Sequence, residues 1–166
     1  MKKIASLKDL MMEQLRDLYH SENELDDLLK KMIESASEPR LRKIFEDYLF
    51  ENKEQVMRLR QAFEPLFEQK RGEMCDAMLA MTKEARDLIN RSADEYVRDA
   101  GLITALQHII HYQIAGYGAV CTYAQMLNFD NVASIIHKNL EVEKHTDREL
   151  AMLAEDVINE RAIKMV

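Results

Sequence analysis

Glycine and proline are scarce in this chain, with 4 Gly and 2 Pro among 166 residues. Antiparallel β-folds and Gly-rich nucleotide-binding folds need many turns, so this scarcity argues against both classes. Trp is absent, and the two cysteines, Cys75 and Cys121, are too far apart for a CxxC redox pair or a Cys-based zinc site. We therefore expect two reduced thiols in a cytoplasmic protein.

Positively charged residues are outnumbered: the chain has 23 Lys and Arg and 30 Asp and Glu, which gives a formal net charge of −7. Such a chain repels phosphate backbones, so we expect no nucleic-acid partner. No stretch reaches about 18 uncharged apolar residues, so we also expect no membrane span and no signal peptide. The hydrophobic content of 47% is enough for one core, and we expect a single domain over residues 1–166.

Apolar residues recur at helical spacing almost throughout the chain. Ser6 with Asp9 and Ser92 with Glu95 form capping-box patterns, and Asp130 follows a tight turn as a further N-cap. Pro65 is expected to bend or end the second helix. The pattern predicts four long helices and a shorter third one, over residues 7–36, 39–69, 74–90, 95–127 and 130–161.

The connections between these helices predict how they are arranged. The first two long helices are joined tightly, and so are the last two, whereas a longer segment with the short helix separates the two pairs. Two antiparallel hairpins linked by one long crossover make up the ferritin-like connectivity. The predicted fold is therefore all-α, a ferritin-like four-helix bundle with a short extra helix in the long crossover.

The seam that each long helix turns toward the core is apolar at both ends and polar near its centre. Antiparallel helices of equal length bring their midpoints to one height, so we expect the central side chains to meet in one layer. Glu51 lies on the flank of the second seam and is able to turn inward. Steps of three and four residues place in this layer Glu22, Asn52, Gln55, Gln113, Glu143 and Thr146.

Two interpretations of this layer stay open. An unpaired buried carboxylate costs several kcal/mol, and no Lys or Arg occupies the seams, so a metal cation, protons or hydrogen bonds must compensate. Metals in bundle cores are held by carboxylates from facing helices, with Glu-x-x-His pairs. The alternative is a hydrogen-bonded layer around protonated or partly hydrated Glu, made by Tyr48, Asn52, Gln55, Gln113 and Thr146.

Short motifs over nearly the whole chain point to one family. They are Asp17-Leu18-Tyr19 with Glu22, Gln55-Val56 with Leu59, Met74-Cys75 with Ala77-Met78, Val97-Arg98-Asp99-Ala100 with Leu102-Ile103, His111-Tyr112 with Ile114-Ala115 and Tyr117-Gly118, and Glu143-Lys144 with Thr146-Asp147. Together they resemble the YciE/YciF family of ferritin-like bacterial stress-response proteins, and more closely its YciF branch. The resemblance implies a dimeric bundle with a two-metal carboxylate site.

The departures from the family pattern fall on that site. Where the family has His-Leu-x-Glu, this chain has Tyr48-Leu49-Phe50-Glu51. Where the family has Glu-His-Tyr-Glu, this chain has Ile110-His111-Tyr112-Gln113. We expect either no cofactor or a single divalent metal, iron or manganese. The candidate ligands for that metal are Glu22, Glu51, Glu143, Gln113 and His111.

The main functional hypothesis is a stress-associated ferritin-like protein with a degraded metal site, which acts through assembly or partner binding. The alternative is a metal-binding oxidase or iron-handling protein of the di-iron or di-manganese type that uses the remaining core carboxylates. A third interpretation is a binding module that docks a partner helix or a shell protein. The sequence assigns no catalytic residue, so whether the protein is an enzyme stays open.

We also expect a homodimer. Gly116 and Gly118 lie inside a helix, where each costs about 1 kcal/mol relative to Ala, and the close approach of a neighbouring helix or subunit would explain them. Closed two-fold dimers are the commonest oligomers. The short helix also carries an apolar stripe that the bundle or a second subunit must cover, made by Met78, Met81, Ala85 and Leu88.

Overall fold

The structure is a computed structural model that describes residues 3–66 and 74–163. These ranges contain helices and no β-strand, which confirms the predicted all-α bundle. Within them, no helix is both long enough and apolar enough to cross a membrane. The elements are α1 (Leu7–Ser35), α2 (Pro39–Phe63), the 3-10 turn η1 (Glu64–Leu66), α3 (Asp76–Arg91), α4 (Glu95–Met126), α5 (Asp130–Leu153), the π-helical turn η2 (Ala154–Ile158) and α6 (Asn159–Ile163).

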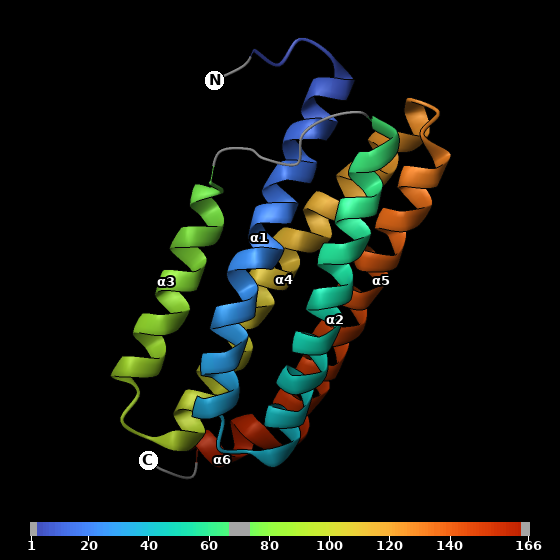
Figure 1. Cartoon of the computed structure of the whole chain (residues 1–166). Helices are drawn as coiled ribbons and strands as arrows, with labels where there is room; N and C mark the ends of the chain where they lie inside the picture. The colour runs from blue at the N-terminus through green and yellow to red at the C-terminus, as the bar shows by residue number, and fades with distance from the viewer. Residues whose placement is uncertain (1–2, 67–73, 164–166) are drawn as a thin grey trace.

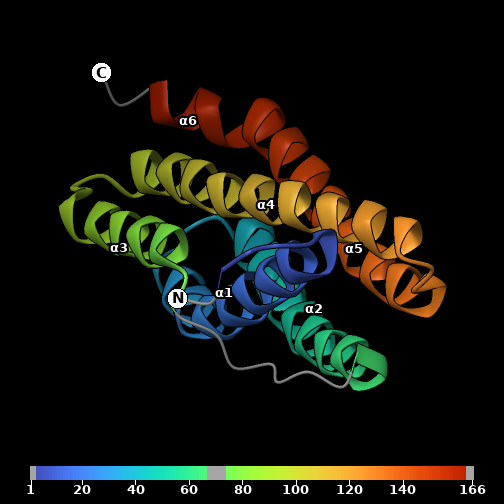
Figure 2. The same cartoon turned by 90° about the horizontal axis from the view of Figure 1, so that it is seen from above.

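Four long helices make the bundle, as two antiparallel hairpins, α1 with α2 and α4 with α5 (Figure 1). α1 also packs beside α4, and α2 beside α5. Because α2 and α4 run in the same direction, the chain must return along the bundle between them, and α3 makes this return. α3 lies outside the four-helix bundle, against α1 and α4 (Figure 2).

The apolar stripe of α3 is covered within the same chain. Met78 and Ala85 are fully buried. Leu88 packs on Gly101 of α4 so closely that a Cβ at position 101 would lie 2.8 Å from Leu88 Cδ2. The stripe therefore needs no second subunit, and this part of the dimer argument falls away.

Several helix ends confirm the sequence prediction and two correct it. The Ser6 hydroxyl accepts the backbone N–H of Asp9 at 3.1 Å, as the first capping box predicts. Pro65 lies in η1, where α2 ends. The Ser92–Glu95 box is wrong, because the Ser92 hydroxyl bonds back to the carbonyl of Leu88. Asp94 is the N-cap of α4 instead, and α5 begins at Asp130, with Phe129 as its cap residue. The expected extension of the second helix beyond residue 66 lies outside the described residues.

The bundle interior consists of two apolar clusters. One is centred on Leu25, Phe45 and Leu106, and the other on Leu15, Leu59 and Val120. Between them lies the height at which the sequence places the polar residues.

A buried carboxylate holds the connection between α1 and α2. Asp99 of α4 is 1% exposed and accepts the backbone N–H groups of Ser37 at 2.9 Å and Glu38 at 2.8 Å. These groups lie where α2 begins and would otherwise lack acceptors. The neighbouring Arg98 donates to the carbonyl of Ser35 at 2.9 Å. The start of α4 thus fixes how the first hairpin turns.

We predict that Asp99→Asn lowers the free energy of unfolding by about 2 kcal/mol, because an amide keeps one acceptor and leaves a buried backbone N–H unpaired. The matched control is Asp87→Asn on α3, which removes only an exposed pairing with Lys83 and is expected to cost less than about 0.5 kcal/mol. Urea unfolding followed by circular dichroism measures both. Equal losses would show that Asp99 does not hold the turn.

Candidate polar-layer site

A layer of polar side chains separates the two apolar clusters, and all four bundle helices contribute to it. Every member is at most 2% exposed. Each lies near the middle of its helix, as the seam pattern predicts, so the antiparallel packing brings them to one height. The members are Glu22 of α1, Tyr48, Asn52 and Gln55 of α2, Gln113 and Tyr117 of α4, and Asn139 and Glu143 of α5.

Glu22 accepts hydrogen bonds from two neighbouring helices. The Tyr117 hydroxyl donates to its Oε1. The Asn52 amide donates to its Oε2 at 2.6 Å and to its backbone carbonyl at 3.0 Å. Both carboxyl oxygens of Glu22 are therefore occupied by protein donors.

Glu143 is held in the same way, with both donors coming from α2. The Tyr48 hydroxyl donates to its Oε2 at 2.7 Å, and the Gln55 amide donates to its Oε1. Tyr48 also lies 3.3 Å from Gln113 Oε1, which places Gln113 against this group.

Asn139 connects the buried layer to the partly exposed side chain of Arg58. Its amide donates to the Tyr117 hydroxyl and to the Gln55 carbonyl, both at 3.2 Å. Its Oδ1 accepts from Arg58 at 3.3 Å. Arg58 is a partly exposed cation, 3.7 Å from Glu51, so positive charge reaches the rim of the layer and not the two buried carboxyls.

Hydrogen bonding in the layer is incomplete. Gln55 Oε1 has no partner, and Gln113 Nε2 makes no well-formed hydrogen bond, although it lies near enough to Glu22 to favour the charged form of that carboxyl. Each unpaired buried group costs about 1–3 kcal/mol. The layer is therefore a cost to stability at the centre of an otherwise apolar core.

The two carboxyl groups favour their protonated forms. Burial raises the pKa of Glu22 to about 7, against the opposing effect of the Tyr117 and Asn52 donors. Burial also raises the pKa of Glu143 well above its usual value, and the charge of Glu22 raises it further. Because the two groups repel when both are ionised, the pair retains at least one proton near neutral pH.

The structure brings together three of the five candidate metal ligands, Glu22, Glu143 and Gln113. It places Glu51 outside the layer, 40% exposed and beside Arg58. It also places His111 on the surface, 63% exposed, with its Nε2 3.2 Å from Asp147.

The membership of the layer differs from the prediction at three residues. The hydroxyl of Thr146, a predicted member, donates instead to the Val142 carbonyl of its own helix. Tyr117 and Asn139 are members that the sequence interpretation missed. Their signal was present, because each lies one helical turn from a predicted member on the same seam, Tyr117 after Gln113 and Asn139 before Glu143.

These residues do not fit a two-metal centre. Such a centre in a bundle uses about four carboxylates and two histidines, and the layer offers two carboxyls and no imidazole. No group of three or more His, Cys, Asp or Glu in the described ranges is placed to hold a metal. The layer can hold a proton on the Glu22–Glu143 pair, whose carboxyl oxygens accept hydrogen bonds from the Tyr48 and Tyr117 hydroxyls.

Comparison with known proteins places the chain in one family. Residues 6–163 match the family described as "Domain of unknown function (DUF892)". The chain is 34% identical to Protein YciF of Escherichia coli over 160 residues, 96% of each chain.

Solved structures give the same result. The E. coli stress protein YciF matches with a TM-score of 0.89 at 33% identity, over 94% of this chain and 99% of that one. YcfI from Rhodopseudomonas palustris matches with a TM-score of 0.87 at 33% identity, over 90% and 96%. A Xanthomonas campestris protein at 17% identity shares the fold, with a TM-score of 0.77 over 96% and 99%. The chain therefore belongs to the DUF892 family of YciF-type proteins, as its motifs indicate.

Proposed function

We propose that this chain is a stress-associated YciF-type bundle protein that acts through assembly, as a homodimer, with a polar layer held by protons and hydrogen bonds. The observation that carries the proposal is the occupancy of the two buried carboxyls. All four of their oxygens accept from protein donors, namely Tyr117, Asn52, Tyr48 and Gln55.

The nature of these donors opposes metal binding. Hydroxyl and amide hydrogens point at the oxygens that a cation would need. A metal would have to displace them and leave up to four buried donors unpaired, each at a cost of about 1–3 kcal/mol. The resemblance implies one histidine and two glutamates at positions 48, 110 and 113. The chain has Tyr48, Ile110 and Gln113 there, which strengthens the case for a layer without metal.

The layer has a structural use that suits a protein acting through assembly. Its hydrogen bonds form only when all four helices lie at the same height, because Glu22 draws donors from α2 and α4 and Glu143 draws both from α2. Buried polar groups are best attested as devices that fix the register of packed helices. A bundle with one register presents one constant outer surface to a partner.

Elemental analysis tests this proposal against a metal-dependent oxidase or iron-handling protein. Protein purified without chelator, from cells supplied with iron and manganese, is expected to contain neither metal in stoichiometric amount. Added iron or manganese is expected to leave the midpoint of thermal unfolding unchanged, because a ligand stabilises only the state that binds it. One or more metal ions per chain, with a raised midpoint, would overturn the metal-free proposal and favour the oxidase.

A double-mutant cycle on Glu22 and Tyr117 measures the cost of the layer. We expect Glu22→Leu with Tyr117→Phe to leave the free energy of unfolding unchanged or to raise it by about 1–3 kcal/mol. The double variant removes a buried carboxyl and one of its two donors, and the other donor, Asn52, keeps its bond to the backbone carbonyl of residue 22. Tyr117→Phe alone is expected to be destabilising, because Glu22 then loses a donor. A loss of stability in the double variant of metal-free protein would contradict this account.

The raised pKa of Glu22 predicts a pH dependence. The folded chain keeps the Glu22 proton up to about pH 7, whereas the unfolded chain releases it near its ordinary pKa of 4.5. The stability that this proton contributes is therefore complete below about pH 4.5 and is lost as the pH rises toward 7. Relative to the Glu22→Gln variant, the parent protein should lose stability between pH 4.5 and 8. Urea unfolding across this range checks the difference, and a constant difference would show that Glu22 does not hold a proton.

A further inference from the structure

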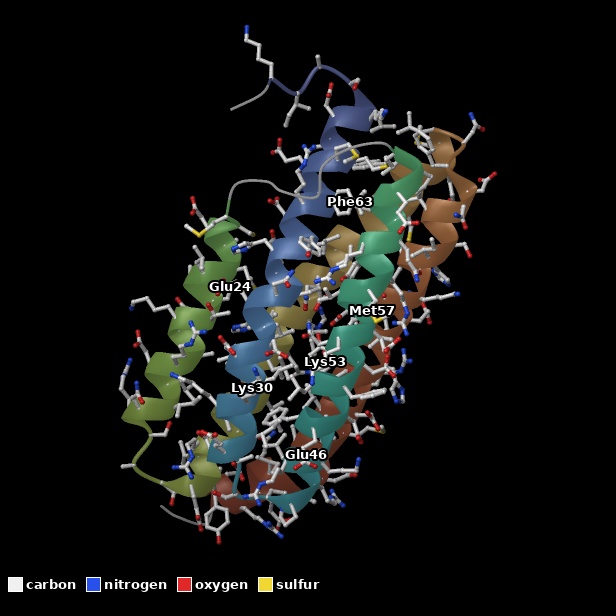
Figure 3. The ribbon with its side chains drawn as sticks, viewed as in Figure 1. Glu24, Lys30, Glu46, Lys53, Met57 and Phe63 are labelled. Carbon is white, nitrogen blue, oxygen red and sulfur yellow. The ribbon has the colours of Figure 1, made fainter. Side chains whose placement is uncertain are left out.

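Two amide side chains of the polar layer each have one polar atom without a partner. Gln55 Oε1 and Gln113 Nε2 are buried, and neither makes a well-formed hydrogen bond to the protein. The charged side chains of α1 and α2, such as Lys30, Glu46 and Lys53, lie on the outer faces of these helices and pair neither atom (Figure 3). Buried polar groups are almost always paired, with protein or with ordered water, so both atoms need an explanation.

Turning the amide of Gln55 around does not provide the missing partner. In the present orientation its Nε2 donates to Glu143 Oε1 and its Oε1 is free. In the reverse orientation Oε1 would face the Glu143 oxygen, and Nε2 would take the position of the unpaired atom. A carboxamide has one acceptor atom and one donor atom, so one of the two is free either way. The second partner of Gln55 is therefore not one of the side chains around it.

The free atom of Gln113 is complementary to that of Gln55. Gln113 Oε1 lies 3.3 Å from the Tyr48 hydroxyl, which donates to Glu143 at 2.7 Å. Both amides therefore belong to the group of side chains around the Glu143 carboxyl. Gln55 Oε1 is an acceptor and Gln113 Nε2 is a donor. One small molecule that donates a hydrogen bond and accepts another would satisfy both atoms.

The two amides come from helices on opposite sides of the bundle. Gln55 belongs to α2 and Gln113 to α4. α1 and α5 each pack against both α2 and α4, so α2 and α4 lie diagonally across the bundle. A molecule between the two amides therefore lies near the axis of the bundle, and it joins two helices that are not neighbours.

We propose that the layer binds an internal water molecule, which donates a hydrogen bond to Gln55 Oε1 and accepts one from Gln113 Nε2. This inference rests on the metal-free layer of the proposed function and names the ligand of that layer. Water fits because internal waters bind where two to four buried polar groups lack protein partners. It also removes the cost that the two unpaired amide atoms impose on the folded state.

A groove between α2 and α5 gives water a route toward the layer. It has a volume of about 530 Å³, and Tyr48 and Thr146 are part of its lining. Tyr48 has the largest exposed fraction in the layer, 2%, so the layer comes closest to solvent there. The lining also contains charged side chains that attract water, among them Asp47, Glu51 and Lys138. We expect the internal water to exchange with bulk solvent on this side.

A high-resolution crystal structure, with anomalous data at the iron and manganese absorption edges, tests the water site. We expect an electron-density peak about 2.7–3.2 Å from both Gln55 Oε1 and Gln113 Nε2, without anomalous signal. Gln113→Met should remove the peak, because the water then loses one of its two partners. The matched control Gln107→Met should keep it, since Gln107 lies on the same helix but donates to Asp147 at 2.9 Å.

Nuclear magnetic resonance tests the site in solution on the parent protein. With isotope-labelled glutamine, the side-chain amide hydrogens of Gln113 should show the nuclear Overhauser effect to water that is typical of a long-lived contact. The amide of Gln107, which is only partly buried, should show the weaker effect of short-lived surface water. This comparison needs no variant, so it stays informative if Gln113→Met fails to fold.

Each contrary outcome identifies what is wrong. A peak with anomalous signal, coordinated by Glu22 or Glu143, would overturn the metal-free layer of the proposed function, and the water site with it. The absence of a peak beside Gln55 Oε1, or of a long-lived water contact at Gln113, would overturn the water site and leave the metal-free layer intact. A peak that Gln113→Met does not remove would show that the water does not bridge the two amides.

Discussion

The pairing of Glu22 and Glu143 with their donors is the constraint that relates the heights of all four bundle helices. Both carboxyls are fully buried, and ionised carboxyls in an apolar core are costly unless they are compensated. Compensation comes from Tyr117, Asn52, Tyr48 and Gln55, together with a raised pKa that keeps a proton on the pair. A shift of any helix by one turn would break these bonds.

The remaining architecture is consistent with that fixed register. The apolar clusters on either side of the layer supply the hydrophobic stabilisation that the layer itself does not. At one end, Asp99 holds the turn between α1 and α2. α3 returns the chain along the outside and seats Leu88 on Gly101. The long crossover is thereby packed against the bundle it connects.

The fold does not by itself decide the chemistry of the polar layer. Strong similarity to YciF in sequence and structure establishes the family and the bundle, whereas chemistry depends on individual side chains. A tyrosine at position 48 and a glutamine at position 113 donate or accept hydrogen bonds but give no imidazole or carboxylate ligand. Replacements at a few positions inside an unchanged fold therefore change which groups such a layer offers.

The sequence by itself determined the helices, their connectivity and most of the polar layer. Helical periodicity and the scarcity of glycine and proline leave few other folds, and heptad steps identify which side chains face inward. The same geometry explains why Glu51 is outside, since it precedes Asn52 by one residue and so points about 100° away from it. The two capping boxes had equal local support, and one was wrong.

Only the tertiary structure decided what depends on contacts between distant residues. Tyr117 and Asn139 join the layer because α4 and α5 bring them to the carboxyl and amide groups of α1 and α2. Packing against α1, α3 and α5 decides how much of α4 is buried beyond its core seam, because burial is a property of the neighbours and not of the helix alone.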